Sequence, residues 1–397
     1  MKLFIILPRF PYPLEKGDKL RAYYFIKHLS MRNEIVLCSL NDNKNLEESS
    51  LDALKPYCKA IHVFNLSRLS IVLNLFRVVF NRKPFQVGYF YNNGVNKKIR
   101  ELVKEHKPDH IFCQLLRVAE YAQFEDIPKT LDYQDVFSMG IQRRIRNSPW
   151  YLKPVLKKEY KRLKSYENKV FDQFENKVII SKPDRDLIPH HNKDQIIIVP
   201  NGVDQEYFVP RIQEKEIDLL FTGNMGYPPN INGAEYLVNK ILPLVKQNKP
   251  ELKVVIAGAN PHKRLLAMHS PGIEVTGWVA DMREYYAKAR IFIAPMQMGT
   301  GLQNKLLEAM AMKIPCITST LANNALEALH GKEILIGKDP EDYAKHIVNL
   351  LDNKEMLDNL AQKGYDFVST KYNWGNNTKL LEKAMISSSN NKSGVSE

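Results

Sequence analysis

The chain of 397 residues has no long hydrophobic run. No apolar stretch approaches the roughly 20 residues that a bilayer-spanning helix needs. The apolar run Lys2–Leu7 near the N-terminus is followed at once by prolines, and it is too short for the core of a secretory signal with its cleavage site. We therefore expect a cytoplasmic protein, with peripheral attachment to the inner face of the membrane left as an open alternative.

Cysteine is also scarce, and the sequence contains no Cys-x-x-Cys pair. Such scattered cysteines fit neither a disulfide framework nor a zinc site, so we expect buried thiols in a reducing compartment. Asp184-Arg185-Asp186 is a weak three-residue match to a metal-binding Asp-x-Asp, and His190-His191 has no further ligand at a suitable spacing. We therefore predict no metal and no cofactor. The four cysteines are Cys38, Cys58, Cys113 and Cys316.

Positive charge dominates the chain, whose formal net charge is +13. The segment 141–170 holds ten Lys or Arg residues against two Glu residues, interleaved with apolar side chains such as Trp150 and Leu156. An amphipathic basic segment suits an anionic surface, although a solvated helix face gives the same pattern. Because no nucleic-acid-binding motif accompanies it, we expect no nucleic acid, and an inner-leaflet membrane surface ranks above it as a partner.

Short apolar runs alternate with helical patterns of about ten or more residues along the chain. Buried parallel strands have this appearance, and the alternation predicts an α/β protein with doubly wound sheets in two domains. The predicted strands are Lys2–Leu7, Glu34–Leu40, Ala60–Phe64, His110–Gln114, Thr130–Tyr133, Lys177–Ile180, Ile196–Val199, Asp218–Thr222, Lys253–Ala257, Ile273–Thr276, Ile291–Ala294 and Cys316–Thr318.

The segment Met298–Pro315, MGTGLQNKLLEAMAMKIP, places a glycine-bearing turn directly before a helix. A helix N-terminus offers unpaired N–H groups and a partial positive charge, which suit a phosphate. Lys305 adds a full positive charge at the same end, and Glu308, about one turn further on, offers acceptors for sugar or ribose hydroxyls. This combination predicts a nucleotide-sugar site.

The same segment resembles the donor-site signature of the group-1 family of retaining glycosyltransferases, in which Glu-x7-Glu precedes an Ala-Met-Ala helix and a proline. Glu308 matches the second glutamate, whereas Thr300 stands where the first would be. The resemblance implies the GT-B architecture, in which two Rossmann-like domains face each other across a cleft. It also implies catalysis without a metal, because the helix dipole and Lys305 would neutralise the leaving diphosphate.

The resemblance extends to the junction Pro200-Asn201-Gly202-Val203-Asp204, which is similar to the family's interdomain segment. It implies an N-terminal acceptor domain over 1–198 and a C-terminal nucleotide-sugar donor domain over 199–372. A terminal helix over 373–386 is expected to cross back to the first domain. The tail 387–397 has Val395 as its only large apolar residue, so we expect it to be disordered.

A second resemblance lies near the N-terminus, where Pro11–Arg21 reads PYPLEKGDKLR. The motif PYPxxKGDKxR resembles the corresponding segment of a subset of bacterial sugar transferases from exopolysaccharide loci. Family members carry a glycine-containing loop here, close to the reaction centre, and a glycine lets a ligand approach the backbone. We assign Lys16, Gly17, Asp18 and Arg21 to an acceptor-side loop, with an ordinary strand-to-helix connection as the alternative.

Two aspartates follow the strand-like run Thr130–Tyr133 at the place where many relatives have a histidine. A carboxylate there would stabilise an oxocarbenium-like state or accept a hydrogen bond from the acceptor hydroxyl. One of them could instead be a helix N-cap. We name Asp135, Asp132 and Lys305 as candidate catalytic residues.

The remaining predicted donor contacts lie on loops that follow second-domain strands. Relatives carry an Arg and a Lys in the first of these loops, but this chain has Asn224 where the Arg would be, so Lys305 must supply the charge. A later Gly-x-Val stretch would contact the base through its backbone. The predicted donor-binding residues are Gly223, Asn224, Gly277, Val279, Thr300, Gly301, Leu302, Asn304 and Glu308.

These features predict a glycosyltransferase that moves a sugar from a UDP- or GDP-sugar to a glycan or lipid-linked acceptor in bacterial surface polysaccharide synthesis. Retention of configuration is implied by the resemblance alone. Two alternatives stay open, namely a nucleotide-sugar epimerase on the same fold and a catalytically degenerate subunit that only binds nucleotide-sugars. The missing first glutamate and the missing Arg/Lys pair are what keep the second alternative open.

Overall fold

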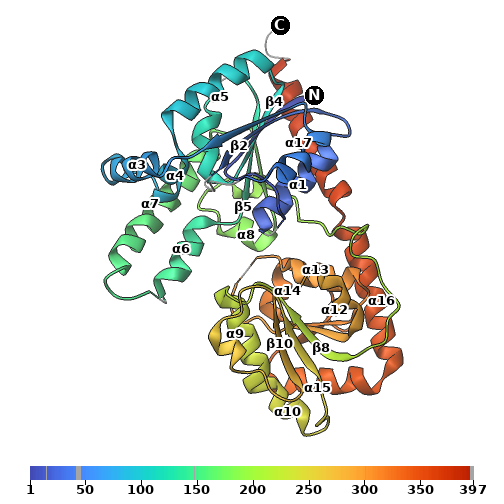
Figure 1. Cartoon of the computed structure of the whole chain (residues 1–397). Coiled ribbons are helices and arrows are strands. Elements are labelled where there is room, and N and C mark those ends of the chain that lie inside the picture. Colours follow the sequence, from blue (N-terminus) through green and yellow to red (C-terminus); the bar gives the residue numbers. More distant parts are fainter. Residues whose placement is uncertain (15, 42–45, 125, 147, 300, 394–397) are drawn as a thin grey trace. The chain divides into compact units, whose positions relative to one another are not determined.

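The computed structural model describes residues 1–14, 16–41, 46–124, 126–146, 148–299 and 301–393. The chain divides into two compact units (Figure 1), one of Met1–Pro200 with Trp374–Glu397 and one of Asn201–Asn373. The boundary at 200/201 lies two residues after the predicted one at 198/199. The C-terminal segment belongs to the first unit, which was the expectation for the terminal helix.

Unit 1 is built on a seven-stranded parallel sheet in the order β3-β2-β1-β4-β5-β6-β7. All seven strands predicted for this part of the chain are present, with ends that differ by at most two residues. The strands are β1 (Lys2–Leu7), β2 (Glu34–Asn41), β3 (Ala60–Asn65), β4 (His110–Gln114), β5 (Lys129–Gln134), β6 (Asn176–Ile179) and β7 (Ile197–Ile198).

Helices cover both faces of this sheet, and the alternation of side chains along β1 shows why. Leu3 and Ile5 join one buried apolar cluster, whereas Phe4 and Ile6 join another on the opposite face. A strand that is buried on both faces must be apolar along its buried length, as Leu3–Leu7 of β1 is. The helices are α1 (Gly17–Leu29), α2 (Glu48–Asp52), η1 (Lys55–Tyr57), α3 (Arg68–Asn81), α4 (Phe85–Phe90), α5 (Asn93–His106), η2 (Leu116–Ala122), α6 (Phe137–Arg146), α7 (Lys153–Phe171), α8 (Lys182–Leu187), η3 (Lys193–Gln195) and α17 (Trp374–Ser393).

Helix α17 is longer than the sequence predicted, and the expected disorder from 387 onward is wrong as far as Ser393. Its first residue, Trp374, stacks on Tyr24 of α1 with ring centroids 4.9 Å apart. Ser388 is buried, and its hydroxyl accepts a hydrogen bond of 2.8 Å from the side-chain amide of Asn176. Ser388 thus bonds to β6, a contact that composition alone does not reveal.

Unit 2 has a six-stranded parallel sheet in the order β10-β9-β8-β11-β12-β13. The five strands predicted here are present, but β13, of three residues, was not predicted. The strands are β8 (Ile217–Thr222), β9 (Val254–Ala257), β10 (Ile273–Gly277), β11 (Ala289–Ala294), β12 (Cys316–Ser319) and β13 (Leu335–Gly337). The helices are α9 (Pro228–Tyr236), η4 (Leu237–Ile241), α10 (Leu242–Lys246), α11 (Lys263–Leu266), α12 (Met282–Lys288), α13 (Asn304–Ala311), α14 (Thr320–Leu326), α15 (Pro340–Asp352) and α16 (Lys354–Lys371).

Both sheets have the same winding, because the strand order reverses once in each. The reversal lies between β1 and β4 in unit 1 and between β8 and β11 in unit 2. In open parallel sheets, ligands bind outside the carboxyl ends of the strands at such a reversal. The topology therefore directs attention to the loops that follow β8 and β11.

Candidate functional site

The reversal point of unit 2 brings the loop after β8 to the first turn of α13. Strands β8 and β11 pair directly, so the loops that leave their carboxyl ends begin side by side. The ammonium of Lys305 donates a 2.6 Å hydrogen bond to the Asn230 side-chain oxygen. A Cβ placed on Gly223 would lie 3.1 Å from the Lys305 nitrogen. The structure therefore brings Gly223, Asn230 and Lys305 together.

Lys305 carries its charge in an unfavourable setting. Its ammonium lies 4.5 Å from the centre of the Phe221 ring, and no carboxylate bonds to it among the described residues. Burial lowers the pKa of Lys305 to about 7, and the nearby Glu308 carboxylate only partly opposes this shift. Because an ammonium loses solvation here, an incoming anion would be a strong partner for it.

Two glycines allow the loops after β8 and β9 to touch. A Cβ on Gly258 would lie only 1.7 Å from the carbonyl oxygen of Gly223, and Gly258 has φ +144°. Gly223 itself has φ +151°, a backbone conformation that side chains with a Cβ rarely adopt. Close backbone contact at this point therefore holds the Gly223 loop beside Lys305.

Glu308 is held by a chain of hydroxyl groups. The Tyr286 hydroxyl donates to its carboxylate at 2.9 Å and lies 2.9 Å from the Thr222 hydroxyl. Burial raises the pKa of Glu308, while the Tyr286 bond and the Lys305 charge oppose that rise. The sequence assigned Glu308 to sugar or ribose hydroxyls and did not identify Tyr286, which lies 22 positions away on α12.

Three other predicted donor residues, Asn224, Gly277 and Asn304, each make a hydrogen bond within the protein. The exposed Asn224 uses its side-chain oxygen to accept from the Gly226 N–H at 3.0 Å, so it folds back on its own loop. Gly277, with φ +78°, accepts from the Gly258 N–H through its carbonyl oxygen at 3.1 Å. Asn304 accepts from the Asn201 side chain at 3.3 Å.

Three further predicted donor residues flank the same helix end or follow β10. Gly301 is exposed and Leu302 is partly buried directly before α13, while Val279 is partly buried after β10. The predicted contact at Thr300 falls outside the described residues. The structure thus places Gly301 and Leu302 beside the first turn of α13, where the sequence expected them, and leaves their contact with a donor as a prediction.

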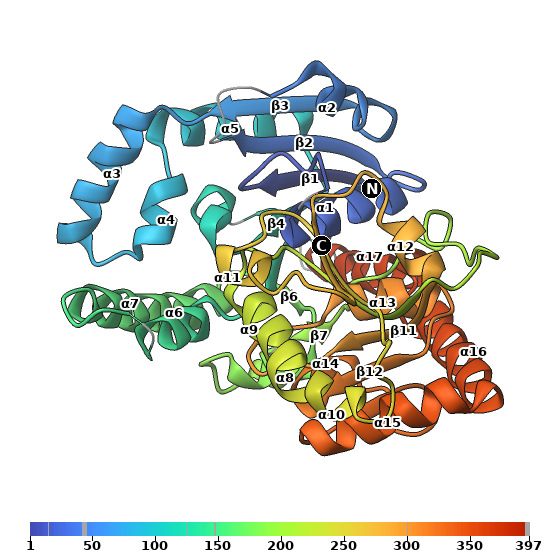
Figure 2. The same ribbon diagram turned by 60° about the horizontal axis from the view of Figure 1, so that its bottom comes forward.

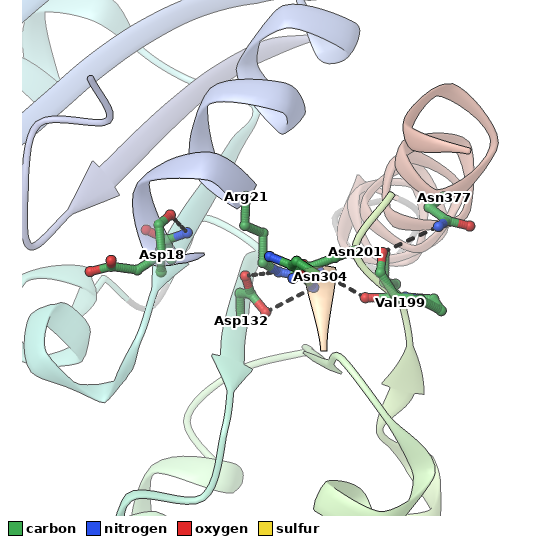
Figure 3. Close-up of polar contacts among 9 residues, drawn as sticks. Asp18, Arg21, Asp132, Val199, Asn201, Asn304 and Asn377 are labelled. Atoms are coloured by element: carbon green, nitrogen blue, oxygen red, sulfur yellow. Dashed lines mark hydrogen bonds and ion pairs between the residues drawn. The ribbon is translucent and has the colours of Figure 1, made fainter. Parts of the chain in front are cut away.

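In unit 1, two predicted site residues form a buried ion pair (Figure 3). Arg21 donates to both carboxylate oxygens of Asp132, at 2.7 and 3.1 Å, and both side chains are inaccessible to solvent. A third bond of 2.9 Å runs from Arg21 to the Val199 carbonyl. In this geometry both Asp132 oxygens are bonded to Arg21, and the predicted roles of Asp132 in catalysis and of Arg21 on the acceptor side stay predictions. The pair ties α1 to β5 and to the segment just after β7.

Asp135 remains available, since its side chain is exposed just after β5. Protein packed around it nevertheless raises the pKa of its carboxyl, against the pull of Arg143. Glu167 lies nearby on α7, fully buried, with one carboxylate oxygen bonded to the Ser138 N–H at 2.9 Å. Burial raises the pKa of Glu167 to about 7. Asp135 is thus the carboxylate of this region that a substrate could reach.

The predicted acceptor-side loop forms the start of α1. Lys16 is the exposed N-cap residue, and Asp18 makes a 3.0 Å ion pair with Arg9 and accepts from Gln114 through its backbone. A Cβ on Gly17 would meet no described atom within 4 Å, so packing does not require glycine at this position.

The weak metal motif is part of a helix cap. Asp184 is buried in α8 and bonds the Ser181 hydroxyl at 2.5 Å, and Arg185 pairs with Asp186 at 3.2 Å. Among the described residues, no three His, Cys, Asp or Glu side chains gather closely enough to hold a metal ion. In that same part of the chain, no helix is both long and apolar enough to cross a bilayer.

Comparison with known proteins begins with unit 2. Residues 216–353 match the family model described as "Glycosyl transferases group 1". The matched range contains Gly223, Gly277 and Glu308 together with Lys305. It therefore covers the site that the structure assembles at the reversal point of the unit 2 sheet.

Whole-chain relatives extend the likeness to both units. A Klebsiella pneumoniae protein described as "Uncharacterized 44.6 kDa protein in cps region" is 23% identical, with 94% of this chain and 96% of that protein covered. Sucrose-phosphate synthase from Thermosynechococcus elongatus has TM-score 0.71 at 13% identity over 96% of this chain and 98% of that one. Anabaena HepE, solved with UDP and glucose, has TM-score 0.67 at 11% identity over 97% and 99%. At such identities the structural matches show the fold.

Proposed function

We propose that this chain is a group-1 glycosyltransferase that moves a sugar from a nucleoside diphosphate sugar to a glycan or lipid-linked acceptor. The match of residues 216–353 to the family model and the fold shared with sucrose-phosphate synthase support this proposal. The relative from a Klebsiella cps region supports a role in bacterial surface polysaccharide synthesis. We further propose retention of configuration and no catalytic metal. A cytoplasmic location stays a prediction.

The observation that carries the proposal is the position of Lys305 on the first turn of α13. When the bond between the anomeric carbon and the diphosphate oxygen breaks, negative charge builds on that oxygen. Lys305 and the N–H groups at the start of α13 would stabilise this charge. Lys305 lies 2.6 Å from Asn230 and beside Gly223, where a Cβ would come within 2.7 Å of the Asn230 amide nitrogen, so glycine lets this loop approach both side chains closely.

The nucleoside would bind along the same edge of the unit 2 sheet. Glu308 is oriented by Tyr286 through a 2.9 Å hydrogen bond, so its carboxylate is preorganised to accept from ribose hydroxyls. The backbone at Gly277 and Val279 would contact the base. That Anabaena HepE was solved with UDP supports a uracil nucleotide as the first donor to test.

The acceptor would bind to unit 1. Gly17 has open space around its Cα, and Asp135 offers an exposed carboxylate near the carboxyl end of β5. We propose that Asp135 accepts a hydrogen bond from the acceptor hydroxyl and so orients it for attack. Asp132 is left out of this proposal because Arg21 occupies both of its oxygens.

The test of this function is donor turnover by purified protein. The protein is incubated with UDP- and GDP-sugars and a membrane extract from a polysaccharide-producing strain, and nucleoside diphosphate release and glycan product are followed by mass spectrometry. We expect Lys305→Met to lower the rate at least about a hundredfold, the size of effect seen when one such charge-stabilising donor is lost. The exposed Lys338→Met in unit 2 is the matched control and should retain full activity.

The outcomes also separate the alternatives. Conversion of a donor into an isomer without any acceptor, seen by NMR, would favour the epimerase hypothesis. Binding of nucleotide without turnover under every acceptor condition would favour the degenerate binding subunit. Equal rates for Lys305→Met and the parent protein would contradict the proposed diphosphate site.

A further inference from the structure

Helix α3 exposes an unusual number of large apolar side chains. Leu69, Val72, Leu73, Phe76 and Phe80 are 51–73% exposed, and their spacing places them on one helix face. Ile71 and Val78 on the other face are buried against unit 1. A contiguous exposed apolar stripe of this kind marks an interaction site more often than it marks ordinary surface.

A second apolar group lies at the turn between α6 and α7. Trp150 is 82% exposed, and Tyr151, Leu152 and Val155 are 40–60% exposed. Trp and Tyr are the residues that favour a membrane–water interface, because each ring is apolar with one polar atom. Figures 1 and 2 both show α3, α6 and α7 on the same side of unit 1.

The two segments that carry these apolar groups are basic and almost free of carboxylates. The segment 68–83 contains no Asp or Glu, and the segment 137–166 contains only Glu159. Glu159 is 4% exposed and turns inward, where it accepts hydrogen bonds from the Phe85 and Gln86 N–H groups. The exposed basic residues are Arg68, Arg77, Arg82, Arg144, Arg146, Lys157, Lys158, Lys161 and Lys164.

Helix α7 fixes the position of α3. The Arg162 guanidinium donates to the carbonyls of Val78, Val79 and Lys83, at 2.9 to 3.1 Å, and so caps the end of α3 with a positive charge. Helix α4 packs so closely that a Cβ on Gly88 would lie 2.1 Å from a Val78 methyl. The contacts of α3 with α4 and α7 therefore fix the orientation of its exposed face.

We propose that this surface, made of α3 and the 144–164 segment and named the α3–α7 surface, docks unit 1 onto an anionic lipid bilayer. The apolar side chains would enter the boundary between headgroups and acyl chains, while the surrounding Lys and Arg contact lipid phosphates. A second copy of the chain is a poor occupant, because two such surfaces carry the same charge. The inference rests on the proposed function and deepens it, since it selects a lipid-linked acceptor over a soluble glycan.

The test is co-sedimentation of the full chain with lipid vesicles. We expect binding to vesicles of phosphatidylcholine mixed with phosphatidylglycerol, and much weaker binding to phosphatidylcholine alone or at high salt. The double variant Phe76→Ser/Phe80→Ser should weaken binding at least about tenfold because it removes two exposed rings that would insert between the lipids. The double variant Lys157→Ala/Lys161→Ala should have a similar effect by removing charge.

Matched controls come from exposed apolar residues of unit 2. Ile212→Ser and Leu329→Ser remove side chains that are also more than half exposed but lie off the α3–α7 surface, and they should bind vesicles like the parent protein. Circular dichroism and UDP titration of every variant check that the fold and the unit 2 site are intact.

Three results would overturn the inference: no vesicle binding by the parent protein, equal binding to neutral and anionic vesicles, or surface variants that bind like the controls. Concentration-dependent dimers that the Phe76→Ser/Phe80→Ser variant abolishes, without vesicle binding, would assign the surface to a second copy. Vesicle binding that fails while UDP titration succeeds would reject the membrane inference alone and leave the proposed glycosyltransferase function standing.

Discussion

At the scale of single residues, the charge state of Lys305 connects the fold to the proposed chemistry. An ammonium that packs beside Phe221 loses part of its hydration, and this burial lowers the pKa of Lys305 to about 7. A bound diphosphate would restore the charged form by direct attraction. The residue is therefore suited to respond to an anion, because its one hydrogen bond within the described part of the chain goes to the neutral amide of Asn230.

The buried pair Arg21–Asp132 supports a prediction about stability. Asp132→Asn leaves the Arg21 charge without its partner, so we expect the free energy of unfolding to fall by about 3–5 kcal/mol in denaturant titrations. The double variant Arg21→Met/Asp132→Leu removes both charges and should recover most of this loss. UDP affinity should not change, because the pair lies in unit 1.

A different result would restore the catalytic hypothesis for Asp132. If Asp132→Asn retained full stability but lost sugar transfer, the carboxylate would act on substrate rather than on Arg21. If the double variant were no more stable than Asp132→Asn, the ion pair would not be the reason for the loss.

At the scale of elements, the shape of the donor site depends on the contact between the loops after β8 and β9. The carbonyl of Gly223 occupies the space where a side chain of Gly258 would begin. This contact orients the Gly223 loop toward the start of α13. The loops after β8 and β9 therefore hold each other in position. The local sequence shows two glycines 35 positions apart, and only the strand order brings them together.

Replacing Gly258 by alanine should therefore damage both stability and binding. Since the new Cβ would lie 1.7 Å from the Gly223 oxygen at a φ of +144°, we expect a loss of about 3 kcal/mol or more in denaturant titration. Gly140→Ala on α6 is the matched control, because no described atom lies within 4 Å of its added Cβ. We expect that variant to be as stable as the parent protein or slightly more so.

Retained UDP binding by a folded Gly258→Ala protein would show that the Gly223 loop does not contact the diphosphate. Loss of stability in the Gly140→Ala control of the same size would show that glycine replacement as such, and not the loop contact, is responsible.

The elements that the sequence predicted best are those buried on both faces. Strands such as β1 and β11 contain the continuous apolar runs Leu3–Leu7 and Ile291–Ala294, and such runs are typical of strands at the centre of a parallel sheet. Strand β13 was missed because Leu335–Gly337 is too short to form a run. The end of α17 was missed because Ser388 is stabilised by a bond to Asn176, far away in the sequence.

Among the site residues too, those brought together by local spacing were predicted and those from distant elements were not. Lys305 and Glu308 were identified because they lie on one helix turn, so local spacing brings them together. Tyr286 was not, since it reaches the site from another element through a hydrogen bond that no local spacing indicates. The ion pair of Asp132 was not predicted because sequence spacing does not show which face of β5 meets Arg21 of α1.

At the scale of the whole molecule, the two units have the same strand winding but different surfaces. Unit 2 holds the candidate diphosphate site at its sheet reversal, within the segment that matches the group-1 family. Unit 1 carries the α3–α7 surface and the exposed carboxylate of Asp135. Our proposals therefore assign the donor to unit 2 and the membrane and acceptor to unit 1, so each assignment has its own variants and readouts.

If the donor diphosphate binds at Lys305, its affinity should depend on pH. Lys305 has a lowered pKa of about 7 in the free protein, and binding of a diphosphate should raise it. At a pH between the Lys305 pKa of the free protein and that of the complex, the protein must take up a proton when it binds the diphosphate. Affinity should therefore be greatest near pH 7, since the terminal phosphate is protonated at lower pH, and should fall by up to about tenfold for each unit of pH above 7.

The most direct test is calorimetric titration of UDP and GDP into the full chain at several pH values, in buffers that differ in ionisation enthalpy. We expect binding of one nucleotide with uptake of a proton near pH 8, and loss of both affinity and proton uptake in Lys305→Met but not in Lys338→Met. Absence of binding by either nucleotide, or equal affinity and the same pH dependence in Lys305→Met, would contradict this expectation.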